Sequence, residues 1–132
     1  MKQPKKKETL STWKEKLDRI FSRYIKQRDM INGKGQCISC GDVFTIDQLD
    51  AGHFRSRKYM STRYDEQNVQ LQCRKCNRFN SGEAYQFGQA LDEKYGEGTA
   101  LKLIQKSYEI KKYTVDELKS LYDYYKGKLN AD

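Results

Sequence analysis

The chain has 132 residues and a formal net charge of +8 at pH 7, since 26 Lys and Arg outweigh 18 Asp and Glu. Only 36% of its residues are apolar, so we expect a small hydrophobic core that needs additional stabilisation, such as a disulfide or a structural metal. It has neither the roughly 18 consecutive apolar residues of a membrane helix nor an N-terminal signal-peptide core. We therefore expect a cytoplasmic protein without a membrane partner. The charge favours an anionic partner or simply serves solubility.

The N-terminal quarter predicts a basic tail followed by a helix. Residues 1–7 are Lys-rich, as in a disordered tail. Residues 8–32 carry apolar side chains at helical spacing, at Leu10, Trp13, Leu17, Ile20, Phe21, Tyr24 and Ile25. The opposite face of this helix is basic, which suits either a solvated surface or DNA contact.

Four cysteines form two Cys-x-x-Cys pairs, which are Cys37 with Cys40 and Cys73 with Cys76. Two disulfides would satisfy the even count, but a reducing cytosol favours tetrahedral zinc. Turn-forming residues follow each pair, as expected for two zinc knuckles. Four thiolates close the zinc shell, so we expect structural zinc and no chemistry at that metal.

The 32-residue spacer between the pairs exceeds the spacer of a simple zinc ribbon. It predicts a strand over 43–49, a bulge or turn at Ala51–Gly52 and a returning strand over 53–57. Three side chains of the returning strand would share one face: His53, Arg55 and Arg57. A neutral imidazole between two guanidinium groups suits a scissile phosphate, although a lone histidine is often only a packed or exposed ring.

The C-terminal part predicts three helices, over 83–95, 98–112 and 115–128. Thr114 and Glu117 form a capping box for the last one. The tyrosines of this region could stack on bases, but their helical spacing favours packing. They are Tyr108, Tyr113, Tyr122, Tyr124 and Tyr125. We expect one mainly helical α+β domain over 8–132, with a zinc-stabilised centre over 33–82 and a helical region over 83–132.

Several motifs together resemble a known family. They are Phe21-Ser-x-Tyr24-Ile25, Arg28-Asp29, Cys37-Ile-Ser-Cys40-Gly41, Asp50-Ala-Gly-His53-Phe54, Arg63-Tyr-Asp-Glu-x-Asn68-Val, Gln72-Cys-x-x-Cys76-Asn77 and Ser81-Gly82. The order of these motifs resembles the zinc-containing HNH nucleases, and more closely the phage NinG (Rap) recombination proteins. The resemblance implies a ββα-metal core, in which a β-hairpin and a short helix hold one catalytic divalent ion.

The same resemblance implies roles for single residues. His53 would be the general base, Asn77 a ligand of the catalytic ion and Asn68 the brace of the hairpin loop. Asp50 is the remaining candidate ligand. The commoner HNH pattern has an Asp or His directly before the base, where this chain has Gly52. In a regular strand Asp50 would face away from His53, so it reaches the ion only if Ala51–Gly52 forms a bulge. The alternative is that Asp50 caps a turn or holds a ligand in place.

The expected function is a metal-dependent endodeoxyribonuclease with a structural zinc and a catalytic Mg²⁺ or Mn²⁺. Phosphate would be bound by Arg55, Arg57, Lys58 and Arg78. The family resemblance further implies that the substrate is branched DNA, such as Holliday junctions. It also implies a phage or prophage gene in a bacterial host and is compatible with a homodimer. Two alternatives stay open: a zinc-stabilised nucleic-acid-binding module that does not cut, and a sequence-specific HNH nuclease.

Overall fold

The computed structural model describes residues 8–79 and 83–130. The predicted basic tail over 1–7 and the Ser81-Gly82 motif lie outside this range. The chain divides into two compact units, one formed by 1–24 with 112–132 and the other by 25–111. Within the described residues, no helix combines the length and apolar character needed to cross a membrane.

The first unit is built by helices α1 (Leu10–Asp29) and α5 (Val115–Asn130), of which α1 continues into the second unit. Aromatic and aliphatic side chains fill its core, and the rings of Phe21 and Tyr125 meet edge to face at 4.9 Å. The predicted capping box is present, because Thr114 and Glu117 exchange side-chain to backbone hydrogen bonds of 3.0 and 3.1 Å. Both helices were expected from the apolar spacing, within a few residues at their ends.

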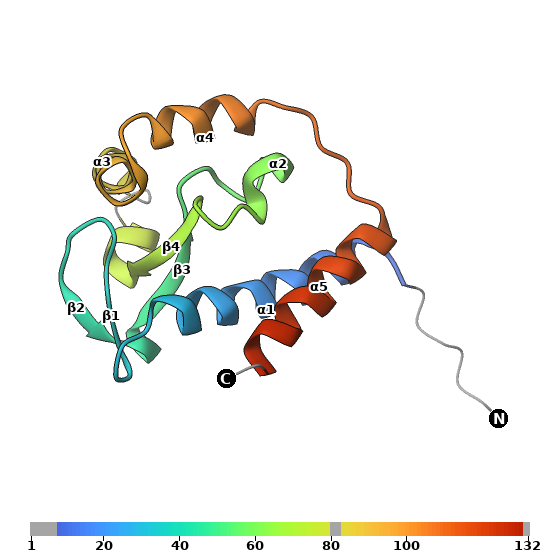
Figure 1. Cartoon of the computed structure of the whole chain (residues 1–132), viewed down its shortest axis with the longest axis horizontal. Helices are drawn as coiled ribbons and strands as arrows, with labels where there is room; N and C mark the ends of the chain where they lie inside the picture. Colours follow the sequence, from blue (N-terminus) through green and yellow to red (C-terminus); the bar gives the residue numbers. More distant parts are fainter. Residues whose placement is uncertain (1–7, 80–82, 131–132) are drawn as a thin grey trace. The chain divides into compact units, whose positions relative to one another are not determined.

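The second unit contains two antiparallel two-stranded sheets. β1 (Lys34–Gln36) pairs with β2 (Val43–Thr45), and β3 (Leu49–His53) pairs with β4 (Val69–Cys73). A 3₁₀ turn, η1 (Ile46–Gln48), links β2 to β3. β4 runs directly into a short helical segment, η2 (Lys75–Phe79), at the green-to-yellow part of the chain in Figure 1.

The strand predictions around His53 were wrong in two respects. The strand ends at His53 and pairs with β4, so there is no returning strand over 53–57 and the three basic side chains do not share a strand face. Ala51 and Gly52 form no bulge, because β3 and β4 pair without interruption from Leu49 to His53. Gly52 serves close packing instead: a Cβ there would lie 2.1 Å from the Gln72 side-chain oxygen on β4.

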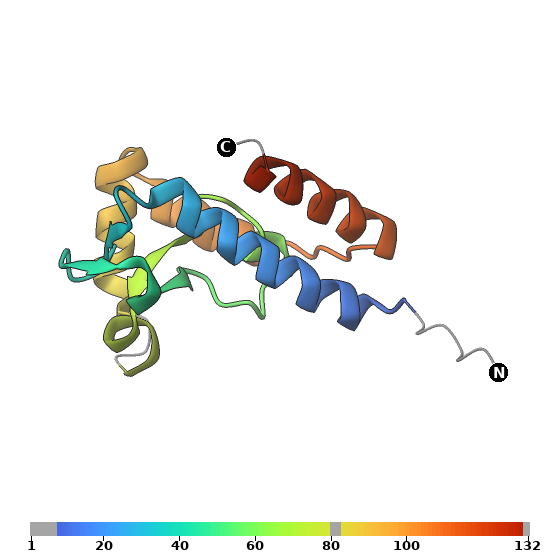
Figure 2. The ribbon, with the colours of Figure 1, turned by 90° about the horizontal axis from the view of Figure 1, so that it is seen from below.

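The described part of the second unit also contains helices α2 (Met60–Arg63), α3 (Ala84–Tyr95) and α4 (Thr99–Ser107). Gly96 and Gly98, both with positive φ, form the tight turn between α3 and α4 seen in Figure 1 and Figure 2. α4 ends five residues before the predicted 112. Its buried face stops at Ser107, and the apolar residues beyond, such as Ile110, are exposed.

Among the described residues, two buried apolar clusters lie in this unit. One contains Leu49 and Leu71 with three of the cysteines, and the other contains Phe87, Leu91 and Leu103. Mixed α+β structure with mainly helical content agrees with the predicted class. In chain order, α2 lies between β3 and β4, and η2 follows β4.

Candidate metal centre and candidate nuclease site

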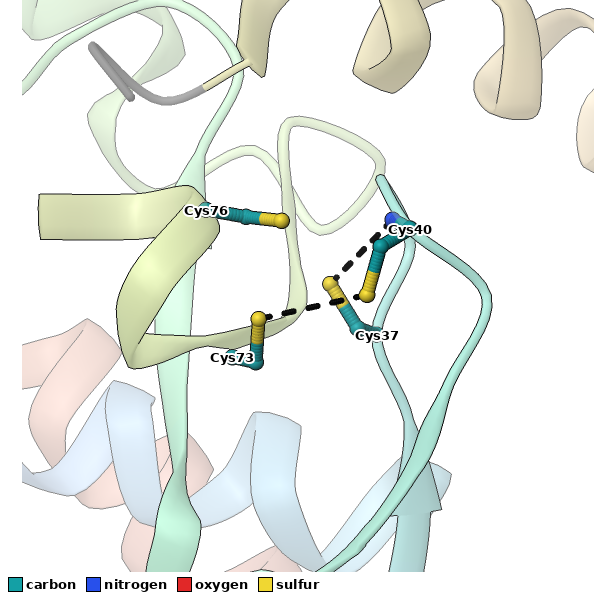
Figure 3. A group of neighbouring side chains, drawn as sticks. All are labelled: Cys37, Cys40, Cys73 and Cys76. Carbon is teal, nitrogen blue, oxygen red and sulfur yellow. Dashed lines mark hydrogen bonds between the residues drawn. The ribbon is translucent and has the colours of Figure 1, made fainter. Parts of the chain in front are cut away.

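The four cysteines come together within the second unit. Cys37 and Cys40 lie on the turn after β1, Cys73 ends β4 and Cys76 lies in η2. Figure 3 shows the two pairs facing each other from two separate segments. Their sulfur atoms all lie within 4.8 Å of one another, and the Cys40 and Cys73 sulfurs are 4.0 Å apart. All four are free thiols, which excludes the disulfide alternative in this structure.

The backbone around the first pair forms a knuckle. The Cys40 N–H points to the Cys37 Sγ at 3.5 Å, and the Gly41 N–H donates to the Cys37 carbonyl at 2.9 Å. Gly41 has φ +80°, a conformation that favours glycine. Burial raises the pKa of Cys37, but backbone N–H groups lower it more, so the pKa of this thiol lies below its ordinary value.

These sulfurs could hold a structural zinc ion. Tetrahedral ligands at about 2.3 Å from zinc are about 3.8 Å from each other, so only a small contraction is needed. Three of the four cysteines are buried, and Cys40 is exposed. An all-thiolate site of this kind leaves no open position, which gives the metal a structural role.

Asp50 on β3 lies beside Asn77 on η2. The Asn77 side-chain amide donates to the Asp50 carboxylate at 3.0 Å, and Arg78 binds both carboxylate oxygens at 2.9 Å. Partial burial raises the pKa of Asp50, but these hydrogen bonds and the charges of Arg78 and Arg74 lower it more. The net effect holds the pKa of this carboxyl below its usual value, so Asp50 is an anion at neutral pH.

His53 ends β3, three residues after Asp50, and strand alternation turns it to the other face. Its Nε2 atom lies 3.0 Å from the Arg63 carbonyl oxygen. A carbonyl only accepts hydrogen bonds, so Nε2 carries the proton in this arrangement and Nδ1 has the lone pair. A neutral His53 that donates to this carbonyl therefore has its lone pair on Nδ1.

Asn68 closes the loop between β3 and β4. Its fully buried side chain accepts from the Arg55 N–H at 2.8 Å and donates to the Arg55 and Thr62 carbonyls at 3.0 Å each. The loop that Asn68 fixes also carries Arg63, the partner of His53. These three hydrogen bonds fix the loop against itself in this structure.

The predicted phosphate-binding side chains differ in their surroundings. Arg57 and Lys58 are exposed on the β3–β4 loop. The Arg55 guanidinium is partly buried: it donates to the Ser107 hydroxyl at 2.9 Å and lies over the Tyr59 ring at 4.6 Å. Arg55 therefore ties the loop to α4 in this structure.

Two contacts of the candidate site were not foreseen from the sequence. The Arg63 carbonyl is a backbone group, and no side-chain motif marks it. The ion pair of Arg78 with Asp50 joins residues 28 positions apart, so no local spacing reveals it. Outside the candidate site, Arg28 was also not foreseen as a structural contact. It donates to the Glu66 and Val69 carbonyls at 2.8 and 3.0 Å and braces the start of β4. The sequence indicated Arg28 only through its place in the family motif.

Comparison with known proteins places the chain in one family. The model of the bacteriophage lambda NinG protein family matches residues 1–132. The chain is similar to Protein ninG of Salmonella phage P22, with 32% identity over 120 residues, and to Protein ninG of Escherichia phage 933W, with 31% identity over 120 residues. Protein ninG of Escherichia phage lambda is 30% identical over 120 residues.

These alignments cover 90% of this chain and 56–57% of the relatives, so the chain spans somewhat more than half the length of the curated proteins it matches. No solved structure matches it. Because the family model extends over the whole sequence and the same family name recurs among the relatives, the chain belongs to the phage NinG family.

Proposed function

We propose that this protein is a metal-dependent endodeoxyribonuclease of the HNH type that acts on branched DNA. The observation that carries the proposal is the His53 imidazole, whose Nε2–H is held by the Arg63 carbonyl at the end of a β-hairpin. The remaining nitrogen, Nδ1, is thereby kept as a proton acceptor. A general base must offer such a lone pair to the water that it activates.

Oxygen donors on the opposite face of the same strand support a divalent-ion site. Asp50 and Asn77 offer a carboxylate and an amide oxygen, both hard ligands of the kind that Mg²⁺ and Mn²⁺ prefer. Two protein ligands suffice for ions that keep several waters and also bind substrate phosphate. When bound, the ion would stabilise the negative charge that develops on the phosphate.

β3 is regular and has no bulge, so Asp50 faces away from His53. The commoner HNH pattern has its acidic or histidine ligand directly before the base, which is position 52 in this chain. Positions 50 and 52 point to the same face of β3, because side chains alternate along a strand. Asp50 can therefore supply the ligand that Gly52 lacks, from the same face of the hairpin.

The proposed reaction assigns each side chain one task. His53 Nδ1 takes a proton from a water molecule, and the water oxygen attacks phosphorus. The phosphodiester P–O bond then breaks, and solvent protonates the leaving oxygen. Arg57 and Lys58, exposed on the adjacent loop, hold the DNA backbone without reading its sequence. Asn68 keeps the loop, and with it the Arg63 carbonyl, in position.

The direct test is cleavage by the zinc-loaded chain of a four-way junction and of linear duplex DNA with the same sequence. We expect nicks with Mg²⁺ or Mn²⁺ and none without divalent ion, with the zinc content unchanged. Asn77→Ala should raise the Mn²⁺ concentration needed for half-maximal cleavage. DNA binding without cleavage under any of these conditions would favour the non-cutting binding module.

Competition between the two DNAs tests the substrate. Unlabelled junction should suppress cleavage better than unlabelled duplex of equal length. Equal suppression by both, together with cleavage at one preferred sequence, would instead support a sequence-specific HNH nuclease.

A further inference from the structure

Arg78 occupies the carboxylate that the proposed divalent ion needs. Its Nε and Nη2 atoms donate to the two oxygens of Asp50 at 2.9 Å each. The carboxylate thus has both oxygens engaged by one planar guanidinium, and one of them also accepts from Asn77. A bidentate fork of this kind is the strongest arrangement in which arginine neutralises a carboxylate.

The two partners of this ion pair differ in exposure. The Asp50 side chain is 17% exposed, whereas the Arg78 side chain is 55% exposed. The carboxylate is therefore fixed in the fold, and the guanidinium approaches it from the solvent side. An exposed ion pair is worth about 1 kcal/mol or less, so a divalent ion with water and phosphate ligands can compete with it.

We propose that Arg78 is an internal counter-ion of the metal site, which the divalent ion displaces from Asp50. The proposal rests on the proposed function, because it takes Asp50 as a ligand of that ion. Without the ion, Arg78 neutralises the carboxylate and keeps it in place beside Asn77. With the ion bound, the freed guanidinium stays within a side chain's length of the site and becomes a donor for DNA phosphate.

Arg74 provides a matched control. Its positive charge also acts on Asp50, but its guanidinium donates to the Asp47 carbonyl and makes no fork with the carboxylate. Replacing either arginine by glutamine removes one nearby positive charge. Only Arg78→Gln also removes the competitor bound to Asp50.

The test measures Mn²⁺ binding to the zinc-loaded full chain without DNA, from the electron paramagnetic resonance signal of free Mn²⁺. Removing a competitor of about 1 kcal/mol should lower the Kd about fivefold in Arg78→Gln. Arg78→Lys keeps the charge without the fork and should fall between Arg78→Gln and the unmodified chain. Arg74→Gln should change the Kd less than twofold, and Asp50→Asn should abolish the binding. Zinc content and circular dichroism check that each variant is folded.

Two kinds of failure are distinguishable. If Mn²⁺ binds through Asp50 but Arg78→Gln leaves the Kd unchanged or raises it, or if Arg74→Gln lowers it equally, the counter-ion proposal is wrong and the metal site stands. If neither the unmodified chain nor Arg78→Gln shows binding that depends on Asp50, the metal site of the proposed function falls as well.

Discussion

Replacing Asn68 by alanine should destabilise the unit formed by 25–111 more than any change of an exposed loop side chain. The Asn68 side chain is fully buried and makes three hydrogen bonds, one with the Arg55 N–H and two with the carbonyls of Arg55 and Thr62. Alanine leaves these three backbone groups without their partner. At about 1 kcal/mol for each, the free energy of unfolding should fall by about 3 kcal/mol.

This loss should lower the melting temperature by roughly 12 °C, at about 4 °C per kcal/mol for a chain of this size. Thermal and urea unfolding at fixed zinc concentration measure it, because bound zinc itself contributes stability. Gln67→Ala is the matched control, since the neighbouring Gln67 side chain is exposed and its loss should cost less than 0.5 kcal/mol.

Hydrogen exchange gives a local readout of the same prediction. The Arg55 amide donates to Asn68, so it should be protected in the unmodified chain and exchange much faster in Asn68→Ala. A loss of stability below about 1 kcal/mol, with the Arg55 amide still protected, would refute the assigned role of Asn68 as the brace of this loop.

The other predictions concern zinc and DNA. Cys73→Ser should lose zinc by elemental analysis and unfold the surrounding unit, because that site contributes folding energy; a folded, zinc-free variant would contradict this. Burial raises the pKa of the Cys76 thiol, so zinc must displace its proton; the zinc affinity should therefore fall as the pH is lowered from 8 to 6, and zinc addition should release protons to an indicator dye. Arg57→Ala should lower the salt slope of DNA binding by about 0.9. Arg55→Ala should chiefly lower the melting temperature, because it loses its bond to Ser107, and a change in salt slope alone would reverse that assignment.

The features predicted correctly from the sequence are those that depend on residues close together in the chain. The two Cys-x-x-Cys pairs predicted a common metal site, because each pair forms its knuckle within a few residues and thiolates are strong zinc ligands. The apolar spacing of the first helix and the capping box at Thr114 likewise depend only on neighbours along the chain. These features were visible without knowledge of the tertiary fold.

The pairing of β3 was not predictable in this way. Its partner β4 begins sixteen residues after His53, and Gly52 is typical of a bulge when seen alone. In the structure, the missing side chain of Gly52 makes room for Gln72 from the partner strand, which no local pattern indicates. The same holds for Asp50 and Arg78, which meet only because η2 follows β4 and lies beside β3.

The most direct test of the nuclease assignment is single-turnover cleavage of a four-way junction by His53→Ala at saturating Mn²⁺. His53 is the only histidine of the chain, so no second imidazole can replace it as the base. The variant should fold, keep its zinc and bind DNA, while the cleavage rate falls by roughly 10² to 10⁴, the usual contribution of a positioned general base. Cleavage at the unmodified rate would show that His53 is not the general base and would overturn the nuclease assignment built on it.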